Sequence, residues 1–316
     1  MRSLWPPLAV WLCLFVGWGC ERSKPEASPL LSPVDAGPTS SAPSSEGMTP
    51  AIADHRLHRL AAGTMDVENR YGAALMLTAD AETRVASCSG VLLNPRVALT
   101  AASCVCWPGR TDLDRPPEKR IWDASTCAER TFLRTVRYGA AQDPEYKETS
   151  TSKTFRNLQG RVRAHPDFKL VLDDRGAVLT SHADLALIVL DSVLEDRLPF
   201  VALAESEVQA DETLIMAGFA DDMRFGGFAG IRYFRKNKVT QVTAEAGRIL
   251  YEQQGPFLYD GYTGGPCFRE DKNHPWLVGI ASVGSDRELS FTSTYFFREW
   301  LRAELRHAAP ALGERP

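Results

Sequence analysis

The feature that most restricts the fold of this chain is a series of short apolar runs separated by turn residues, beginning near Leu60. Each run is rich in Val, Ile and Leu and is bounded by Gly, Pro, Asn or Asp; examples span 73–78, 90–93, 97–100, 185–190, 214–218, 238–243 and 277–283. Runs of this length and composition predict β-strands. Apolar residues with helical spacing occur only near the end, within 295–305. The pattern therefore predicts an all-β barrel or sandwich with a terminal helix.

The first 50 residues differ from the rest in composition. A short positive start precedes an apolar segment at 4–16, which is shorter than the roughly 20 residues that span a bilayer, so residues 1–19 are expected to be a signal peptide. Cys20 resembles the lipidation site of a bacterial lipoprotein; ordinary signal-peptidase cleavage after Gly19 is the alternative. Six prolines within 21–50 indicate that residues 20–55 form a disordered tether. The main domain is then 56–308, with a tail at 309–316.

Composition excludes several classes of function. The formal net charge of −4 leaves no basic footprint for nucleic acid. The cysteines lack the spacing of a structural zinc site, and no glycine-rich phosphate loop is present, so neither a metal nor a cofactor is expected. Disulfides outside the cytoplasm are the expected use of the cysteines. The chain is therefore expected to be exported to the cell envelope, lipid-anchored at the outer membrane or in the periplasm, or alternatively secreted. Membrane contact is expected only through a lipidated Cys20.

Three segments occur in an informative order. The first, within 88–104, contains CSGVLL at 88–93 and VALTAASC at 97–104; the second is ADLAL at 183–187, and the third is GYTGGP at 261–266. Together they resemble the trypsin-like (chymotrypsin-fold, peptidase S1) serine protease family, whose patterns end in T-A-A-H-C, D-[IL]-A-L and G-D-S-G-G-P. The resemblance extends from about Leu60 to Leu305. It implies two six-stranded antiparallel β-barrels of the chymotrypsin/trypsin fold followed by a C-terminal α-helix.

The resemblance assigns the three catalytic positions to Ser103, Asp184 and Thr263. The family's chemistry needs an imidazole base, a buried carboxylate and a nucleophilic hydroxyl, and of these the carboxylate is kept as Asp184. Ser103 has no lone pair of useful basicity near neutral pH, and the methyl group of Thr263 crowds the path of attack. Loss of the base alone costs on the order of 10⁴ to 10⁶ in turnover. An inactive homologue, a pseudoprotease, is therefore expected.

The same resemblance implies further site residues. The oxyanion hole falls at Gly261 and the amide of Thr263, and the substrate-binding positions are Phe257, Ser282, Val283 and Gly284. Phe257 would place a bulky apolar ring at the base of the specificity pocket. Tyr262 occupies the position where the family has an acid that pairs with the α-amino group created by activation cleavage. Arg59-Leu60 resembles a degraded activation site, and no carboxylate is available there to pair with the α-amino group of Leu60.

The resemblance also implies disulfide bonds. Cys88 and Cys104 flank the family's first loop and are expected to pair, and Cys106 with Cys127 is the second expected pair. Cys267 is then left over, either as a buried free thiol or as an intermolecular contact.

Three functions remain open. The first is an envelope-tethered binding or regulatory module with a protein or peptide partner. The second is an active endopeptidase-like hydrolase that uses Thr263 with an unconventional base such as His182, which lies two residues before Asp184 and is therefore expected to share its face of a strand. The third is a structural envelope protein. The charged stretch at 107–160 is either a solvated face or a partner-binding loop. The sequence does not indicate the oligomeric state.

Overall fold

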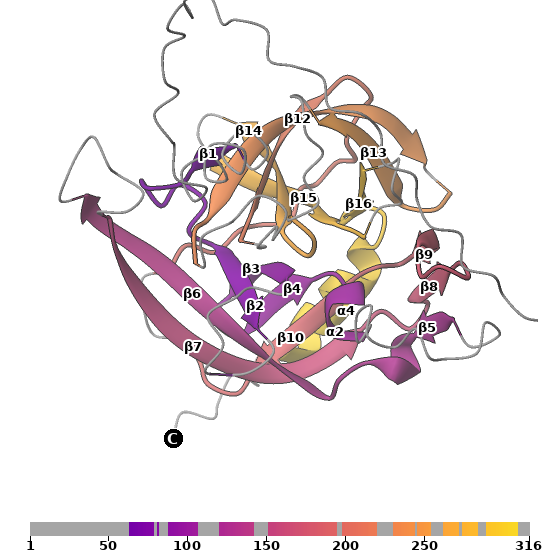
Figure 1. Cartoon of the computed structure of the whole chain (residues 1–316), viewed down its shortest axis with the longest axis horizontal. Helices are drawn as coiled ribbons and strands as arrows, with labels where there is room; N and C mark the ends of the chain where they lie inside the picture. The colour runs from indigo at the N-terminus through magenta and orange to yellow at the C-terminus, as the bar shows by residue number, and fades with distance from the viewer. Residues whose placement is uncertain are drawn as a thin grey trace, which may run out of the picture. The chain divides into compact units, whose positions relative to one another are not determined.

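A computed structural model describes residues 63–78, 81, 88–106, 120–141, 151–194, 198–219, 230–243, 245–253, 262–271, 274–283 and 289–308. The expected signal peptide, Cys20, the tether and the tail lie outside these residues. The described chain is mostly β-strand, with two closed six-stranded antiparallel barrels and a short C-terminal helix (Figure 1). The prediction of an all-β, double-barrel fold with a terminal α-helix is confirmed.

The first barrel closes in the order β10-β4-β3-β2-β6-β7. Its strands are β2 (Ala74–Thr78), β3 (Cys88–Asn94), β4 (Val97–Thr100), β6 (Arg130–Ala141), β7 (Thr151–Ala164) and β10 (Ala186–Leu190). Side chains alternate between the two sides of a strand, so alternate residues of each strand fill the interior. Leu75, Leu77, Leu133, Leu158 and Ile188 are among the buried residues there.

The second barrel has the order β12-β11-β14-β15-β16-β13 and closes through pairing of β12 with β13. Its strands are β11 (Thr213–Gly218), β12 (Tyr233–Thr243), β13 (Arg248–Gln253), β14 (Pro266–Asp271), β15 (His274–Ala281) and β16 (Leu289–Ser293). Leu214, Val239, Ile249, Val278 and Phe291 form part of its core. The short strand β1 (Thr64–Met65) pairs with the β12 edge, so the N-terminal end of the described chain is attached to the second barrel.

Smaller elements complete the domain. A three-stranded sheet consists of β5 (Ile121–Asp123), β8 (Lys169–Leu172) and β9 (Val178–His182). The short helix α2 (Ser103–Cys106) precedes β5 in the chain, and the short helix η3 (Ala124–Thr126) follows it. The terminal helix α4 (Arg298–Ala308) is shifted slightly from the predicted 295–305. Its Leu301 is buried in one cluster with Leu99 of the first barrel and Ile280 of the second. The helix therefore packs against strands of both barrels.

Two disulfides join Cys88 to Cys104 and Cys106 to Cys127, which are the two expected pairs. Cys267 is a free, buried thiol in the core of the second barrel, and its burial raises its pKa well above the ordinary value. Among the described residues, no helix is long and apolar enough to cross a membrane.

Candidate functional site

Ser103 and Asp184 form a two-point contact at the start of helix α2. The backbone N–H of Ser103 donates to Asp184 Oδ1 at 2.6 Å, and the Ser103 hydroxyl donates to Asp184 Oδ2 at 2.9 Å. Both side chains are almost fully buried. The structure thus brings together two of the three residues that the sequence assigned to the catalytic positions.

The second barrel places Ser282 and Val283 beside the Asp184 carboxylate. Burial raises the pKa of Asp184, whereas the two hydrogen bonds from Ser103, the Ser282 hydroxyl and the backbone N–H of Val283 act in the opposite direction. The Ser282 Oγ lies 2.6 Å from the Thr292 hydroxyl oxygen. Ser282 and Val283, assigned to substrate binding from the sequence, therefore lie next to this buried carboxylate.

Asp184 reaches this position through a sharp change of backbone direction after strand β9. Ala183 has a φ of +48°, and the N–H of Leu185 donates to the carbonyl of Ala183 at 2.7 Å. This turn separates Asp184 from His182, so the two residues do not continue one regular strand. His182 is exposed, and its ring lies 6.2 Å from that of Phe297. The expectation that His182 shares a strand face with Asp184 is therefore wrong, because the strand ends at His182.

Thr263 lies in a tight turn formed by residues 262–265. The N–H of Gly265 donates to the Tyr262 carbonyl at 2.7 Å, and the N–H of Gly264 donates to the carbonyl of Ala281 at 2.7 Å. Gly264 has a φ of +79°, and a Cβ atom there would lie 2.3 Å from the carbonyl oxygen of Ser89. A side chain at this position would meet both backbone strain and a collision with backbone. The turn that presents Thr263 consequently requires glycine at 264.

Ser89 connects this turn to both barrels. Its N–H donates to the carbonyl of Thr263 at 2.8 Å, and its carbonyl accepts from the Thr100 hydroxyl at 2.7 Å. Its hydroxyl accepts from the N–H of Phe219 at 2.8 Å. The sequence analysis did not single out Ser89 as an anchor; its one signal was the position immediately after Cys88.

The Cys88–Cys104 disulfide lies against the same turn. A Cβ atom on Gly264 would be 2.9 Å from the sulfur of Cys104, the residue that follows Ser103. The Thr263 turn of the second barrel therefore packs on the segment of the first barrel that carries Ser103. Gly261, Phe257 and Gly284, also predicted as site residues, lie outside the described residues.

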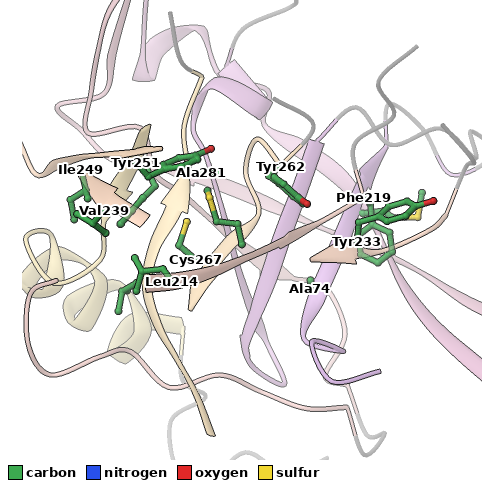
Figure 2. Packing of buried hydrophobic residues seen from close by; sticks show 14 of the residues in the cluster. Ala74, Leu214, Phe219, Tyr233, Val239, Ile249, Tyr251, Tyr262, Cys267 and Ala281 are labelled. Carbon is green, nitrogen blue, oxygen red and sulfur yellow. The ribbon is translucent and has the colours of Figure 1, made fainter. Parts of the chain in front are cut away.

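Tyr262, next to Thr263, is buried in a hydrophobic cluster that contains residues of both barrels. It is 2% exposed, and Figure 2 shows its ring among the buried residues of that core. Burial raises the pKa of its phenol far above the ordinary value, and the neighbouring Arg235 acts in the opposite direction. A buried, neutral aromatic ring therefore precedes Thr263, at the position where the sequence analysis noted the absence of the family's acid.

The described residues contain no cluster of three or more His, Cys, Asp or Glu side chains that could hold a metal ion. At the site, the Ser103 hydroxyl bonds to the Asp184 carboxylate, and the hydroxyls of Ser282 and Thr292 bond to each other nearby. A hydroxyl donates and accepts hydrogen bonds, but it does not take up a proton near neutral pH. The described arrangement is suited to hydrogen bonding rather than to proton transfer.

The two closed six-stranded antiparallel barrels, with the site built from segments of both, fit a chymotrypsin-like double-barrel fold. Comparison of the chain with protein-family models and with curated proteins gave no match.

Proposed function

We propose that this protein is a catalytically inactive, trypsin-like serine protease homologue that acts as a binding or regulatory module in the cell envelope. The observation that supports this most directly is the hydrogen bond from the Ser103 hydroxyl to Asp184. In a working triad the carboxylate orients an imidazole that takes the proton of the nucleophile. Here the carboxylate holds a hydroxyl, so Thr263 lacks a base at this position.

The persistence of the surrounding architecture supports a binding role. The Thr263 turn keeps its two glycines, its contacts to Ser89 and its packing on the disulfide. Such a scaffold can bind a protein or peptide without performing chemistry on it. The chain's start, with its apolar segment and Cys20, supports export and a lipid anchor, and the two disulfides suit an oxidising compartment.

Labelling of the full chain with a fluorophosphonate probe tests the absence of an activated hydroxyl. The expected result is no labelling of the wild type, as for the blank Thr263→Ala. A double variant, Ser103→His with Thr263→Ser, serves as the comparison, because it restores the base and the primary alcohol while leaving Tyr262 in place. Labelling of the wild type that Thr263→Ala abolishes would show a live nucleophile and would establish the alternative, a hydrolase with an unconventional base.

A further inference from the structure

The terminal helix α4 follows the second barrel after a short turn. Thr294, next to the end of β16, is fixed to β15: its N–H donates to the carbonyl of Val278 and its hydroxyl to the carbonyl of Leu277, each at 3.0 Å. A turn at 294–297 leads from there to the helix. The helix itself is held by side-chain packing, with Leu301 buried in a cluster that contains residues of both barrels. The turn is therefore a hinge about which α4 can separate from the barrels.

His165 of the first barrel packs against this segment. Its buried imidazole lies 4.9 Å from the ring of Phe297 in the turn and 4.7 Å from the ring of Trp300 in the helix, measured between ring centroids. On the barrel side, its backbone N–H donates to the carbonyl of Leu185 at 2.9 Å, and its Nδ1 accepts from the backbone N–H of Asp167 at 3.2 Å. One imidazole, fixed to the barrel, thus contacts both the hinge and the helix.

Protonation of His165 changes this contact in two ways. An imidazolium donates from both ring nitrogens, so Nδ1 can no longer accept from the N–H of Asp167. The buried ring would also carry a positive charge away from water and near His182, whose ring lies 6.2 Å from that of Phe297. Burial is the largest cause that lowers the pKa of His165, the nearby Asp167 raises it, and His182 lowers it. The docked helix therefore favours the neutral imidazole.

The other charged groups at this contact lie nearer the solvent. Arg163 of β7 and Glu304 of α4 form a partly exposed ion pair with an Nη1–Oε2 distance of 2.8 Å, and Glu304 Oε1 lies 4.0 Å from Nδ1 of the exposed His307. An ion pair of this kind contributes little to stability. The remaining charged side chains of the helix are exposed or contact their own segment: Arg298, Glu299, Arg302 and Arg306. His165 differs from all of them because it is buried.

We propose that His165 is an acid-sensitive latch on the terminal helix: its protonation favours a state in which α4 has separated from the first barrel about the turn at 294–297. Release gives the imidazole access to water, where its charged form is stable, and exposes the apolar side chains of Phe297 and Leu301. The latch does not involve Thr263. It is therefore independent of whether the Thr263 site is active.

Proton linkage sets the size of the effect. In the released state the imidazole has the ordinary pKa of 6.5, whereas in the docked state its pKa is lower. If the docked state bound no proton at all, the equilibrium constant for release would rise about thirtyfold between pH 7.5 and pH 5.0. Partial protonation of the docked state reduces this factor, so we expect a rise of about threefold to thirtyfold.

Hydrogen exchange of the full chain at pH 7.5 and pH 5.0, corrected for the intrinsic pH dependence of exchange, tests this proposal. The amides of 301–308 in α4 are compared with those of 277–281 in β15. We expect the helix to open with a lower free energy than β15 at both pH values, and its opening constant to rise about threefold to thirtyfold at pH 5.0. Equal opening free energies in the two segments would show that the helix opens only with the whole domain and would overturn the proposal.

Three variants identify the responsible group. His165→Asn keeps an acceptor for the N–H of Asp167 but does not titrate, so we expect the acid effect to fall below about twofold. His307→Asn and Glu304→Gln change titratable groups of α4 that lie nearer the solvent, and both are expected to keep a rise of at least about threefold. A full rise in His165→Asn, or its loss in either control, would contradict the latch.

A measurement on the wild type covers the case in which His165→Asn does not fold. The titration of the His165 imidazole is followed by NMR, and its midpoint is compared with the pH dependence of exchange in α4. We expect protonation of His165 and release of α4 to occur over the same pH range. A helix whose opening constant stays unchanged while His165 becomes protonated would overturn the proposal.

Discussion

The hydroxyl of Ser103 and the carboxylate of Asp184 lie 2.9 Å apart, and the backbone N–H of the same serine contacts the second carboxylate oxygen at 2.6 Å. This pair is buried, and Ser282 and Val283 of the second barrel lie beside the carboxylate and lower its pKa. Segments from both barrels therefore meet at one ionisable group, the carboxylate of Asp184. The contributions of the Ser103–Asp184 pair and of the turn at 262–265 to stability can each be measured with single substitutions.

Ser103→Ala removes one donor from the buried carboxylate while leaving the backbone donor in place. A hydrogen bond to a charged group contributes about 1.5–3 kcal/mol, so we expect the free energy of unfolding to fall by about this amount. Chemical denaturation measures the change. Ser125→Ala is the control, because the Ser125 hydroxyl also bonds to a carboxylate, that of Asp123, but at an exposed site. Equal losses in the two variants would contradict a special role for the buried pair.

Gly264→Ala introduces a Cβ atom at a positive φ and against the backbone of Ser89. Backbone strain alone costs on the order of 1–3 kcal/mol, and the collision adds to it. We expect the melting temperature to drop strongly. Gly139→Ala is the control, since the closest atom there is the Ser152 hydroxyl oxygen at the end of a movable side chain. A melting temperature of Gly264→Ala at or above that of Gly139→Ala would show that the turn does not need glycine.

Tyr262→Asp tests whether an aromatic ring is required before Thr263. A carboxylate in this buried cluster would lose its hydration, so we expect a loss of at least about 3 kcal/mol in the free energy of unfolding. Tyr262→Phe keeps the ring and removes only the phenol oxygen, with an expected loss of about 1 kcal/mol. Denaturant titration of both variants measures the difference. An aspartate variant as stable as the phenylalanine variant would indicate that a carboxylate is accommodated there.

The ion pair between Arg232 and Asp66 is buried within the fold. Arg232 Nε lies 2.7 Å from Asp66 Oδ2, and both side chains are at most 1% exposed. Asp66→Ala leaves the guanidinium buried without its carboxylate, for which we expect a loss of about 3–5 kcal/mol.

An exposed ion pair provides the comparison for Asp66→Ala. Lys238 Nζ and Asp211 Oδ1 lie 2.6 Å apart at the surface, so Lys238→Ala is expected to change the unfolding free energy much less than Asp66→Ala does. Denaturation curves of Asp66→Ala and Lys238→Ala measure the two losses in unfolding free energy. A much larger loss in Asp66→Ala would show that the fold requires the buried ion pair. Similar small losses in both would mean that the buried pair adds little to stability.

His165 makes stability depend on pH. Its ring is buried against Phe297 and Trp300 of the terminal segment, and this burial lowers its pKa below the ordinary 6.5; nearby Asp167 raises the pKa, and His182 lowers it. The unfolded chain therefore takes up the proton first. The stability contribution is complete above about pH 6.5 and is lost as the pH falls toward the lowered pKa.

Melting temperatures at pH 7.5 and pH 5.0 measure this effect. We expect the drop between the two pH values to be smaller in His165→Asn, whose amide oxygen can accept from the N–H of Asp167 as the imidazole does. His307→Asn, at an exposed position of α4, should keep the wild-type drop. An unchanged drop in His165→Asn would exclude His165 as the responsible group.

Much of the fold could be predicted because buried strands have a simple sequence signature. The run at 97–100 is buried at every position and was predicted with the bounds of β4. The β6–β7 hairpin was missed because basic residues interrupt its apolar positions, as at Arg134 and Arg156. Its strands are recognisable only once they pair with each other and with the barrel.

The sequence predicted the strand-rich architecture and, through the family resemblance, the two disulfide pairs. It also assigned Ser103, Asp184 and Thr263 to one set of positions, and the structure brings Ser103 and Asp184 of that set together. The apolar runs that mark buried strands are local properties of residue type and order, so the strands could be predicted without the tertiary structure. Three relations became visible only in the folded chain: Ser89 anchors the Thr263 turn, Tyr262 is buried in a cluster shared by both barrels, and strand β9 ends at His182 before Asp184. These relations depend on contacts between segments far apart in the chain and on one backbone turn at Ala183, which residue spacing does not encode.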